Sequence, residues 1–359
     1  MSDNPFFTIG IASYNYAHYI LHALEQIKKQ SIRDFEVLIS DDGSNDNSVE
    51  VIKEFIKLNP EICIRIIVKE NNDGLIANKN TIIENAKGKY LMLCDADDWM
   101  SDNYLQIAHE KIIKENPDRL ICDVCHIGEN DKIIQVEHVP LNQTKWGWLI
   151  HHGSFYRMDI IKKYNIRIEA EPDDVYFILN FSKYCTRLSI VNEIHYFWLV
   201  HNDSEGRRNR GDIDDKYFNQ FYICEKKYVI NMLNDINVSH VNGQNEVNER
   251  ITFSNKIINK DYDELKLVLL KLYYRDILFR LQQTSLKCKI KYYIRLKKYL
   301  KLNIPDLWKC KCLFNKTNIV MRSFAIRTIK VCRFLDISCL MFPFLIAYHL
   351  ITKVVVIDQ

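Results

Sequence analysis

The sequence predicts an α/β fold in which a mostly parallel sheet is flanked by helices. Short apolar runs alternate four times with segments of helical periodicity, and the joints between them are short. A short apolar run bounded by polar residues is typical of a strand that helices cover on both faces. With 359 residues, of which 47% are apolar and 26% charged, the chain can form one large domain or two ordinary ones.

The expected elements follow one another from the amino terminus. The first four predicted strands cover residues 6–12, 35–39, 62–68 and 91–94. Apolar residues at helical spacing predict the helices that follow these strands, at 17–30, 45–58, 75–86 and 102–115. Segments rich in β-forming residues predict further strands at 119–127, 131–139 and 194–200. Right-handed crossovers would bring the carboxyl ends of the first four strands to one edge of the sheet.

Three carboxylates, those of Asp95, Asp97 and Asp98, follow the strand at 91–94 within four residues. Open α/β sheets bind their ligands at the carboxyl ends of the strands. Carboxylates this close repel one another unless a cation or hydrogen-bond donors satisfy them. A hard divalent ion that also takes phosphate oxygens is the natural partner. The simpler alternative is an acidic turn that caps the next helix.

Two more predicted strand ends carry polar or aromatic side chains. Tyr14 follows the first strand, and Asp41 and Asp42 follow the second. An aromatic ring can stack on a base, and a carboxylate can accept hydrogen bonds from a base or a ribose. The sequence contains neither a Gly-x-Gly-x-x-Gly nor a Walker-type phosphate loop, so we expect a metal ion to help bind a diphosphate.

Four short motifs occur in a characteristic order: Ser13-Tyr14-Asn15, Asp41-Asp42-Gly43-Ser44, Asn72-Asp73-Gly74 and Asp95-Ala96-Asp97-Asp98. In this order and spacing they resemble the family 2 glycosyltransferases of GT-A fold, over roughly residues 7–204. The sequence departs from the family at three places, one of them around Ser101, where a proline that is common after the acidic cluster is replaced. Lys79 stands where the family often has an arginine, and Ile82 stands where a glycine is usual.

The resemblance implies a sugar nucleotide that lies across the strand ends. Tyr14 would stack on the base, Asp42 with Asp41 would hold base or ribose, and Asp95 would reach the ribose. Mg²⁺ or Mn²⁺ would bridge the diphosphate. The nucleotide-sugar-binding residues so implied are Ser13, Tyr14, Asp41, Asp42, Lys79, Asp95, Asp97, His201 and Arg207. The metal ligands so implied are Asp97, Asp98 and His201.

A second acidic cluster contains Asp173 and Asp174, directly after Pro172. Proline suits the first turn of a helix and carboxylates suit its amino end, so simple capping is one interpretation. The resemblance implies that one of the pair is the general base that deprotonates the acceptor hydroxyl. We favour Asp174, with Asp173 as the second choice.

The adjacent histidines His151 and His152 lie in an aromatic, polar segment. Neighbouring side chains on an extended chain point in opposite directions, so we expect no metal role for this pair.

The function that the resemblance implies is that of an inverting, metal-dependent glycosyltransferase. It would move a sugar from a nucleotide-diphospho-sugar, with a UDP-sugar favoured, to a saccharide or lipid-linked acceptor in bacterial surface polysaccharide synthesis. One alternative is a nucleotidyltransferase acting on a sugar phosphate, although such enzymes usually carry a glycine-rich loop where Ala12 to Asn15 stands. Another is a non-catalytic GT-A-like scaffold.

Charge divides the chain into parts with different expected partners. From Lys256 onward Lys and Arg outnumber Asp and Glu by 21 to 7, whereas residues 1–255 hold 28 against 39. We therefore expect a GT-A domain at 1–210, a connecting segment at 211–255 and a basic, amphipathic helical region at 256–359. That region would either lie on an anionic membrane surface or pack on the catalytic domain.

We expect no nucleic-acid partner, because no recognition module accompanies the basic stretch. The first strand follows the amino terminus without an apolar leader, and the 11 cysteines are scattered and odd in number. These features predict a cytoplasmic protein with reduced thiols, either free in the cytoplasm or peripheral on the inner face of the cell membrane.

Overall fold

The computed structural model describes residues 4–143, 145, 148, 150–169 and 173–201, together with 290, 293, 294, 297 and 298. The chain divides into two compact units, Met1–Ser204 and Glu205–Gln359. The predicted boundaries at 210 and 255, Arg207 and nearly all of the basic region lie outside the described residues and stay predictions. Within the described residues, no helix is both long and apolar enough to span a bilayer.

The first unit alternates strands and helices up to residue 95, as expected. Its helices are α1 (Ala17–Lys28), α2 (Ser48–Leu58), α3 (Leu75–Asn85), α4 (Tyr104–Glu115), α5 (Met158–Lys163) and α6 (Asp173–Tyr184). Its strands are β1 (Phe7–Ser13), β2 (Phe35–Asp41), β3 (Ile64–Val68), β4 (Tyr90–Asp95), β5 (Trp99–Met100), β6 (Arg119–Gly128), β7 (Ile133–Glu137), β8 (Ser154–Arg157) and β9 (Leu188–Val200). The short elements β5, β8 and α5 were not expected from the sequence.

One mixed sheet joins all the described strands, in the order β3-β2-β1-β4-β8-β6-β9-β5, with β7 beside β6. The first four are mutually parallel, as the apolar runs predict. β8 runs antiparallel to both β4 and β6, whereas β9 is parallel to β6. The arrangement confirms the predicted α/β fold with a mostly parallel sheet.

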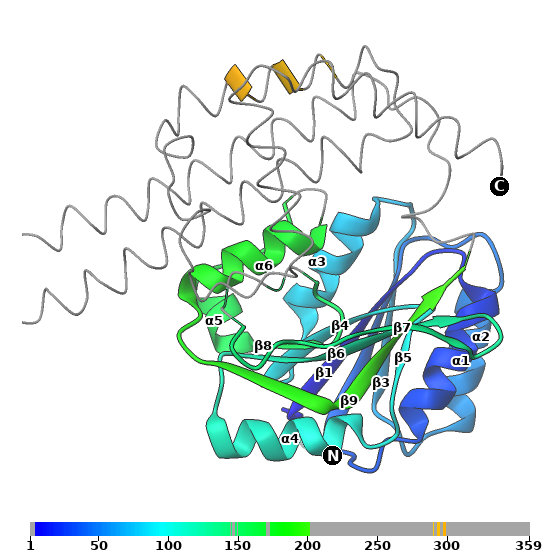
Figure 1. Cartoon of the computed structure of the whole chain (residues 1–359). Coiled ribbons are helices and arrows are strands. Elements are labelled where there is room, and N and C mark those ends of the chain that lie inside the picture. Colours follow the sequence, from blue (N-terminus) through cyan, green and yellow to red (C-terminus); the bar gives the residue numbers. More distant parts are fainter. Residues whose placement is uncertain are drawn as a thin grey trace, which may run out of the picture. The chain divides into compact units, whose positions relative to one another are not determined.

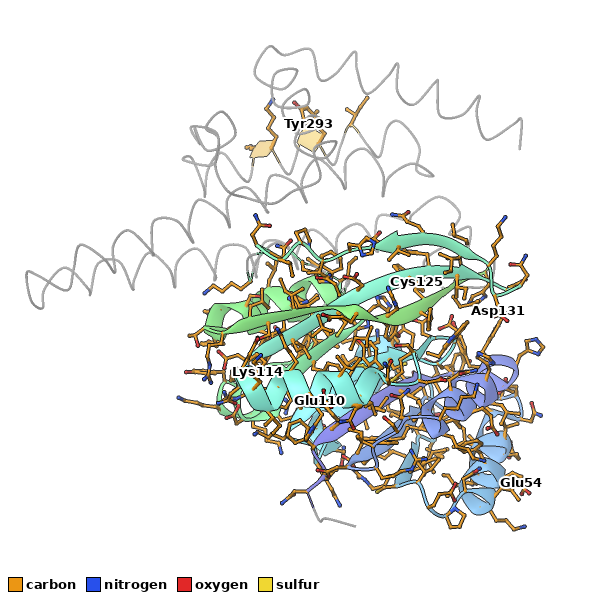
Figure 2. The ribbon with its side chains drawn as sticks, turned by 60° about the horizontal axis from the view of Figure 1, so that its bottom comes forward. Glu54, Glu110, Lys114, Cys125, Asp131 and Tyr293 are labelled. Carbon is orange, nitrogen blue, oxygen red and sulfur yellow. The ribbon has the colours of Figure 1, made fainter. Side chains whose placement is uncertain are left out.

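Helices cover both faces of the parallel part. In Figure 1, α1 and α2 lie side by side on one side of the sheet, and α3 packs on the other side against β1 and β2. This division follows from the right-handed crossovers, because the chain moves outward from β1 to β3 and then returns across β1 to β4. Figure 2 shows Glu110 and Lys114 on the outward side of α4, while Ala108 and Ile112 of the same helix are buried.

A close contact between α3 and β1 accounts for one departure from the family pattern. Ile82 is fully buried, and a Cβ added at Gly10 of β1 would lie only 2.2 Å from its Cγ2 atom. The large residue is therefore on the helix, and the strand opposite it carries the residue without a side chain.

The strand register brings the predicted site residues to one edge. Ser13 of β1 is opposite Asp41 of β2, and Ala12 is opposite Asp95 of β4. The carboxyl ends of three neighbouring parallel strands therefore lie next to one another. Asn78 of α3 reinforces this edge, because its Nδ2 donates to the carbonyl oxygens of Ser13 (3.2 Å) and Ser40 (2.9 Å).

Candidate functional site

The two carboxylates after β2 have different surroundings. Asp41 is fully buried and accepts hydrogen bonds from the backbone N (2.8 Å) and Oγ (2.7 Å) of Ser44, so its oxygens close a turn. Asp42 is 2% exposed and accepts hydrogen bonds from Lys69 Nζ (2.9 Å) and Gly74 N (2.8 Å). Of the two, Asp42 is the one that joins the second motif to the Asn72-Asp73-Gly74 motif.

The end of β1 supplies Ser13 and Tyr14. Ser13 is buried, and its Oγ has no hydrogen-bond partner among the described residues. Tyr14 is half-buried and directly follows the strand. The next residue, Asn15, adopts a left-handed φ of 57°, and its Oδ1 accepts from the backbone N of Asn45 at 2.8 Å. The loop that carries Tyr14 is thus anchored to the loop after β2.

Asp95 lies at the centre of a cluster of basic side chains. Lys79 Nζ of α3 lies 3.3 Å from its Oδ1, His152 Nε2 lies 3.0 Å from its Oδ2, and His151 Nε2 lies 3.9 Å from its Oδ1. Burial alone would raise the pKa of Asp95. The Lys79 charge and the two imidazoles outweigh burial and hold this pKa well below its usual value. Asp95 is therefore a carboxylate at neutral pH.

The expectation that His151 and His152 point apart is wrong. Their rings lie 4.2 Å apart, and both face Asp95. The reason is a turn: Ser154 N donates to the carbonyl oxygen of His151 at 3.0 Å, and Gly153 has a φ of 67°. Glycine at the third position of a turn supplies that positive φ, so the chain is not extended here and the alternation rule does not apply. The His-His-Gly sequence was the signal for this turn.

Asp97 forms a pair with His201 at the end of β9. Asp97 Oδ2 and His201 Nε2 are 2.7 Å apart, and Tyr19 Oη of α1 lies 3.3 Å from the other ring nitrogen. Burial, followed by the nearby charge of Asp95, raises the pKa of Asp97. The structure thus brings together two of the three predicted metal ligands, from positions 104 residues apart in the chain.

Asp98 is used inside the fold. It is fully buried, its Oδ1 accepts from Leu199 N at 2.9 Å, and its Oδ2 accepts from Tyr196 Oη at 2.8 Å. Burial, followed by the charges of Asp97 and Asp95, raises the pKa of Asp98 well above its usual value. Both oxygens are therefore occupied by β9, and Asp98 holds that strand against the end of β4. Tyr196 and Tyr19 are site residues for which the sequence held no signal.

Asp173 and Asp174 are the first two residues of α6, where a capping pair or a general base would both be expected. Their side chains lie outside what the structure describes, so the assignment of the base stays a prediction.

Sequence comparison finds relatives among polysaccharide enzymes and other glycosyltransferases. The chain is 29% identical over 124 residues to glycosyltransferase GlyA of Streptococcus pneumoniae, which covers 34% of this chain and 17% of that protein. It is 25% identical over 278 residues to chondroitin synthase of Pasteurella multocida, which covers 73% of this chain and 27% of that protein. The chain thus spans less than a third of the length of either curated relative.

Structure comparison finds the same fold in S. aureus TarS 1-349. The TM-score is 0.62 at 17% sequence identity, and the match covers 92% of this chain and 90% of that one. A second structure of the same protein, in complex with UDP-GlcNAc, matches with a TM-score of 0.61 at 16% identity.

The family model described as glycosyl transferase family 2 matches residues 8–172. That range contains the four motifs and the strand ends that bring Asp42, Asp95 and Asp97 to one edge of the sheet. The match agrees with the curated glycosyltransferase relatives and with the TarS fold. Residues 8–172 of the chain therefore form a glycosyl transferase family 2 domain.

Proposed function

We propose that this protein is an inverting glycosyltransferase that takes its sugar from a nucleotide-diphospho-sugar. The observation that carries the proposal is the meeting of three strand ends at one edge. Tyr14 follows β1, Asp42 follows β2, and Asp95 and Asp97 stand at the end of β4, in strands that pair directly. An aromatic ring, carboxylates and a lysine at one edge of a sheet form a set that suits a base, a ribose and a diphosphate.

In this proposal the donor lies across the edge with its base toward Tyr14 and Asp42 and its ribose toward Asp95. Lys79, which is 3% exposed and paired with Asp95, places a positive charge next to the ribose and diphosphate positions. A UDP-sugar is the favoured donor. The UDP-GlcNAc complex of TarS, a protein of the same fold, supports this choice.

Asp97 and His201 would hold the divalent cation, Mg²⁺ or Mn²⁺. Neighbouring ligand atoms around an octahedral ion with bonds of about 2.1 Å lie roughly 3 Å apart. The 2.7 Å between Asp97 Oδ2 and His201 Nε2 fits that spacing. Asp98 does not fit, because both of its oxygens are bonded within the fold. When bound, the ion supplies positive charge that stabilises the departing diphosphate.

The acceptor hydroxyl would attack the anomeric carbon on the side opposite the nucleotide, and Asp174 would take its proton. This single displacement inverts the configuration and needs a carboxylate that does not bind the metal. The curated relatives act as glycosyltransferases, one of them a chondroitin synthase. They support a saccharide or lipid-linked acceptor in surface polysaccharide synthesis.

The test is a thermal-shift screen of sugar nucleotides with Mn²⁺, followed by a transfer assay with the stabilising donor. A ligand that binds only the folded state raises the melting temperature in proportion to its affinity. We expect a UDP-sugar to stabilise the protein more than free UDP or a GDP-sugar does. If no sugar nucleotide stabilises the protein with Mn²⁺, the proposal fails and the non-catalytic scaffold is favoured.

A further inference from the structure

We propose that Asp95, His151 and His152 form a second metal site, distinct from the Asp97–His201 pair, which takes a Zn²⁺-class ion. One ligand atom from each of the three residues lies within 4.8 Å of the other two. Two imidazoles and one carboxylate are the donor set of many catalytic zinc sites. Mg²⁺, in contrast, prefers oxygen ligands and keeps much of its water.

The distances suit a small tetrahedral ion. Bonds of about 2.0–2.1 Å place tetrahedral ligand atoms roughly 3.4 Å apart. His152 Nε2 is 3.0 Å from Asp95 Oδ2, and His151 Nε2 is 3.9 Å from Asp95 Oδ1. The two separations end on different oxygens of Asp95, so binding through both histidines requires the carboxylate and the two rings to turn toward a common ion.

The two imidazoles are held in place before any ion arrives. The turn through Gly153 fixes the backbone of both histidines, and the ring of His152 stacks on Trp198 at 4.5 Å and 15°. The side chains of His151 and His152 are only 4% and 6% exposed. Neither Nδ1 atom has a hydrogen-bond partner among the described residues. Because such partners typically improve affinity by about 10–100-fold, we expect modest rather than tight binding.

Lys79 is a built-in competitor for this site. Its Nζ lies 3.3 Å from Asp95 Oδ1 and 3.5 Å from His151 Nε2, so its charge occupies the region where an ion would bind. An ammonium group and a divalent cation at this distance repel each other, and binding requires Lys79 to move away from Asp95. The affinity of the site therefore depends on a residue that is not one of its ligands.

The consequence for activity rests on the proposed function. Asp95 is the residue proposed to reach the donor ribose, so an ion coordinated to Asp95 removes that contact. We expect Zn²⁺ to compete with the UDP-sugar, and not to replace Mn²⁺ as an activator. The enzyme would then be inhibited by a transition-metal ion through residues outside the predicted metal set.

The test uses the full chain, stripped with a chelator and carrying His201→Asn, which removes the imidazole of the other pair. Calorimetric titration with Zn²⁺ alone should show binding that weakens at least about tenfold on adding His152→Ala or His151→Ala. Lys79→Met should strengthen the same binding by about tenfold, a gain that misfolding cannot produce. His138→Ala is the matched control, because that imidazole is 70% exposed and pairs with Asp123 instead.

Titration with Co²⁺ identifies the ligands directly. An Asp-His-His site gives visible bands without the strong near-ultraviolet absorption of thiolate ligands. Zinc affinity that survives both histidine variants, or a cobalt spectrum of thiolate type, would overturn the proposal. Zinc binding that follows these variants while no sugar nucleotide binds would leave the metal site standing and reject the proposed function alone.

Discussion

Two neighbouring carboxylates in one motif have different surroundings. Asp97 faces His201 and has a pKa that burial and Asp95 raise, whereas both oxygens of Asp98 accept hydrogen bonds from β9. The sequence predicted the motif and its place at a strand end correctly. The sequence could not show which carboxylate is held inside the fold, because the residues that donate hydrogen bonds to Asp98 lie about a hundred positions further along the chain.

Replacing these two residues separately tests the difference. We expect Asp97→Ala to abolish transfer and Mn²⁺-dependent donor binding while changing the free energy of unfolding little. Asp98→Ala should instead lower the free energy of unfolding by about 2–3 kcal/mol, since it leaves Leu199 N and Tyr196 Oη without their acceptor. Urea denaturation and donor titration measure the two effects. Equal destabilisation by both variants would contradict the division of roles.

The general base can be assigned by the same kind of comparison. Asp174→Asn should reduce turnover by at least about a hundredfold while donor affinity stays within a factor of two, because the base acts on the acceptor and not on the nucleotide. Asp173→Asn, at the first position of α6, is the matched control. If Asp173→Asn alone abolishes turnover, Asp173 is the general base and our assignment to Asp174 is off by one residue.

At the scale of elements, α3 packs against β1 through a large residue on the helix and a glycine on the strand. A Cβ at Gly10 would meet Ile82 Cγ2 at 2.2 Å, so the helix can approach the strand only because Gly10 has no side chain. Ile82 departs from the family pattern, in which a glycine is usual at this position of the helix. The structure shows that the space is filled, because Ile82 is fully buried against the sheet.

A double-mutant cycle measures this contact. Gly10→Ala should destabilise the protein by about 1–3 kcal/mol through overpacking, and Ile82→Ala by about 2–5 kcal/mol through a cavity. The double variant should be more stable than the sum predicts, because the new methyl group occupies part of the cavity. Chemical denaturation gives the coupling free energy. Strictly additive losses would show that the two residues do not share one space.

Asp118 joins three elements, and its effect should depend on pH. Its Oδ2 accepts from Thr186 N (2.8 Å) and Arg187 N (3.0 Å), and Arg157 of β8 lies 3.1 Å from Oδ1. Burial would raise the pKa of Asp118, but these donors outweigh burial and lower it below its ordinary value. The stabilisation is therefore fully present above the unfolded pKa of about 3.9, and it is lost as the pH falls through the folded pKa.

We expect Asp118→Asn to lower the free energy of unfolding by about 2–3 kcal/mol at pH 7, because buried donors lose a charged acceptor. The difference from the parent protein should shrink as the pH falls below about 4. Asp159→Asn is the control: this carboxylate also pairs with Arg157 but is 64% exposed, so its loss should cost under about 1 kcal/mol. Denaturation curves at pH 7 and below about pH 4 measure the difference in the free energy of unfolding. A loss of the same size at both pH values would argue against the ionic contribution of Asp118.

The elements that the sequence failed to predict are those fixed by distant partners. The strands that became β1, β2 and β4 were evident from apolar runs, because each is buried on both faces. The short strand β8 has no such pattern, and it exists because β4 and β6 pair with it from either side. The turn that directs His151 and His152 to Asp95 depends on Gly153, a local signal that we overlooked when we treated the two histidines as part of an extended chain.

At the scale of the whole molecule, charge divides the chain into an acidic part, residues 1–255, and a basic part from Lys256 onward. The balance is −11 over residues 1–255 and +14 from Lys256 onward, although the net charge is only +3. An acidic domain is repelled by anionic lipid, whereas a basic segment is attracted to it. A lipid-linked acceptor would be presented at such a surface, so attachment through the basic part would concentrate the protein where that acceptor lies.

We therefore expect the full chain to cosediment with anionic vesicles and not with neutral ones, and to be released as salt screens the attraction. Each Lys or Arg near an anionic membrane surface contributes about 1 kcal/mol to the free energy of membrane binding. The three substitutions Lys287→Gln, Lys289→Gln and Lys291→Gln together should therefore weaken vesicle binding roughly a hundredfold. The matched control makes the same charge change in the acidic part, at the exposed Lys53, Lys57 and Lys114. An equal loss in both triple variants would mean that only net charge matters, and equal binding to neutral vesicles would exclude electrostatic attachment altogether.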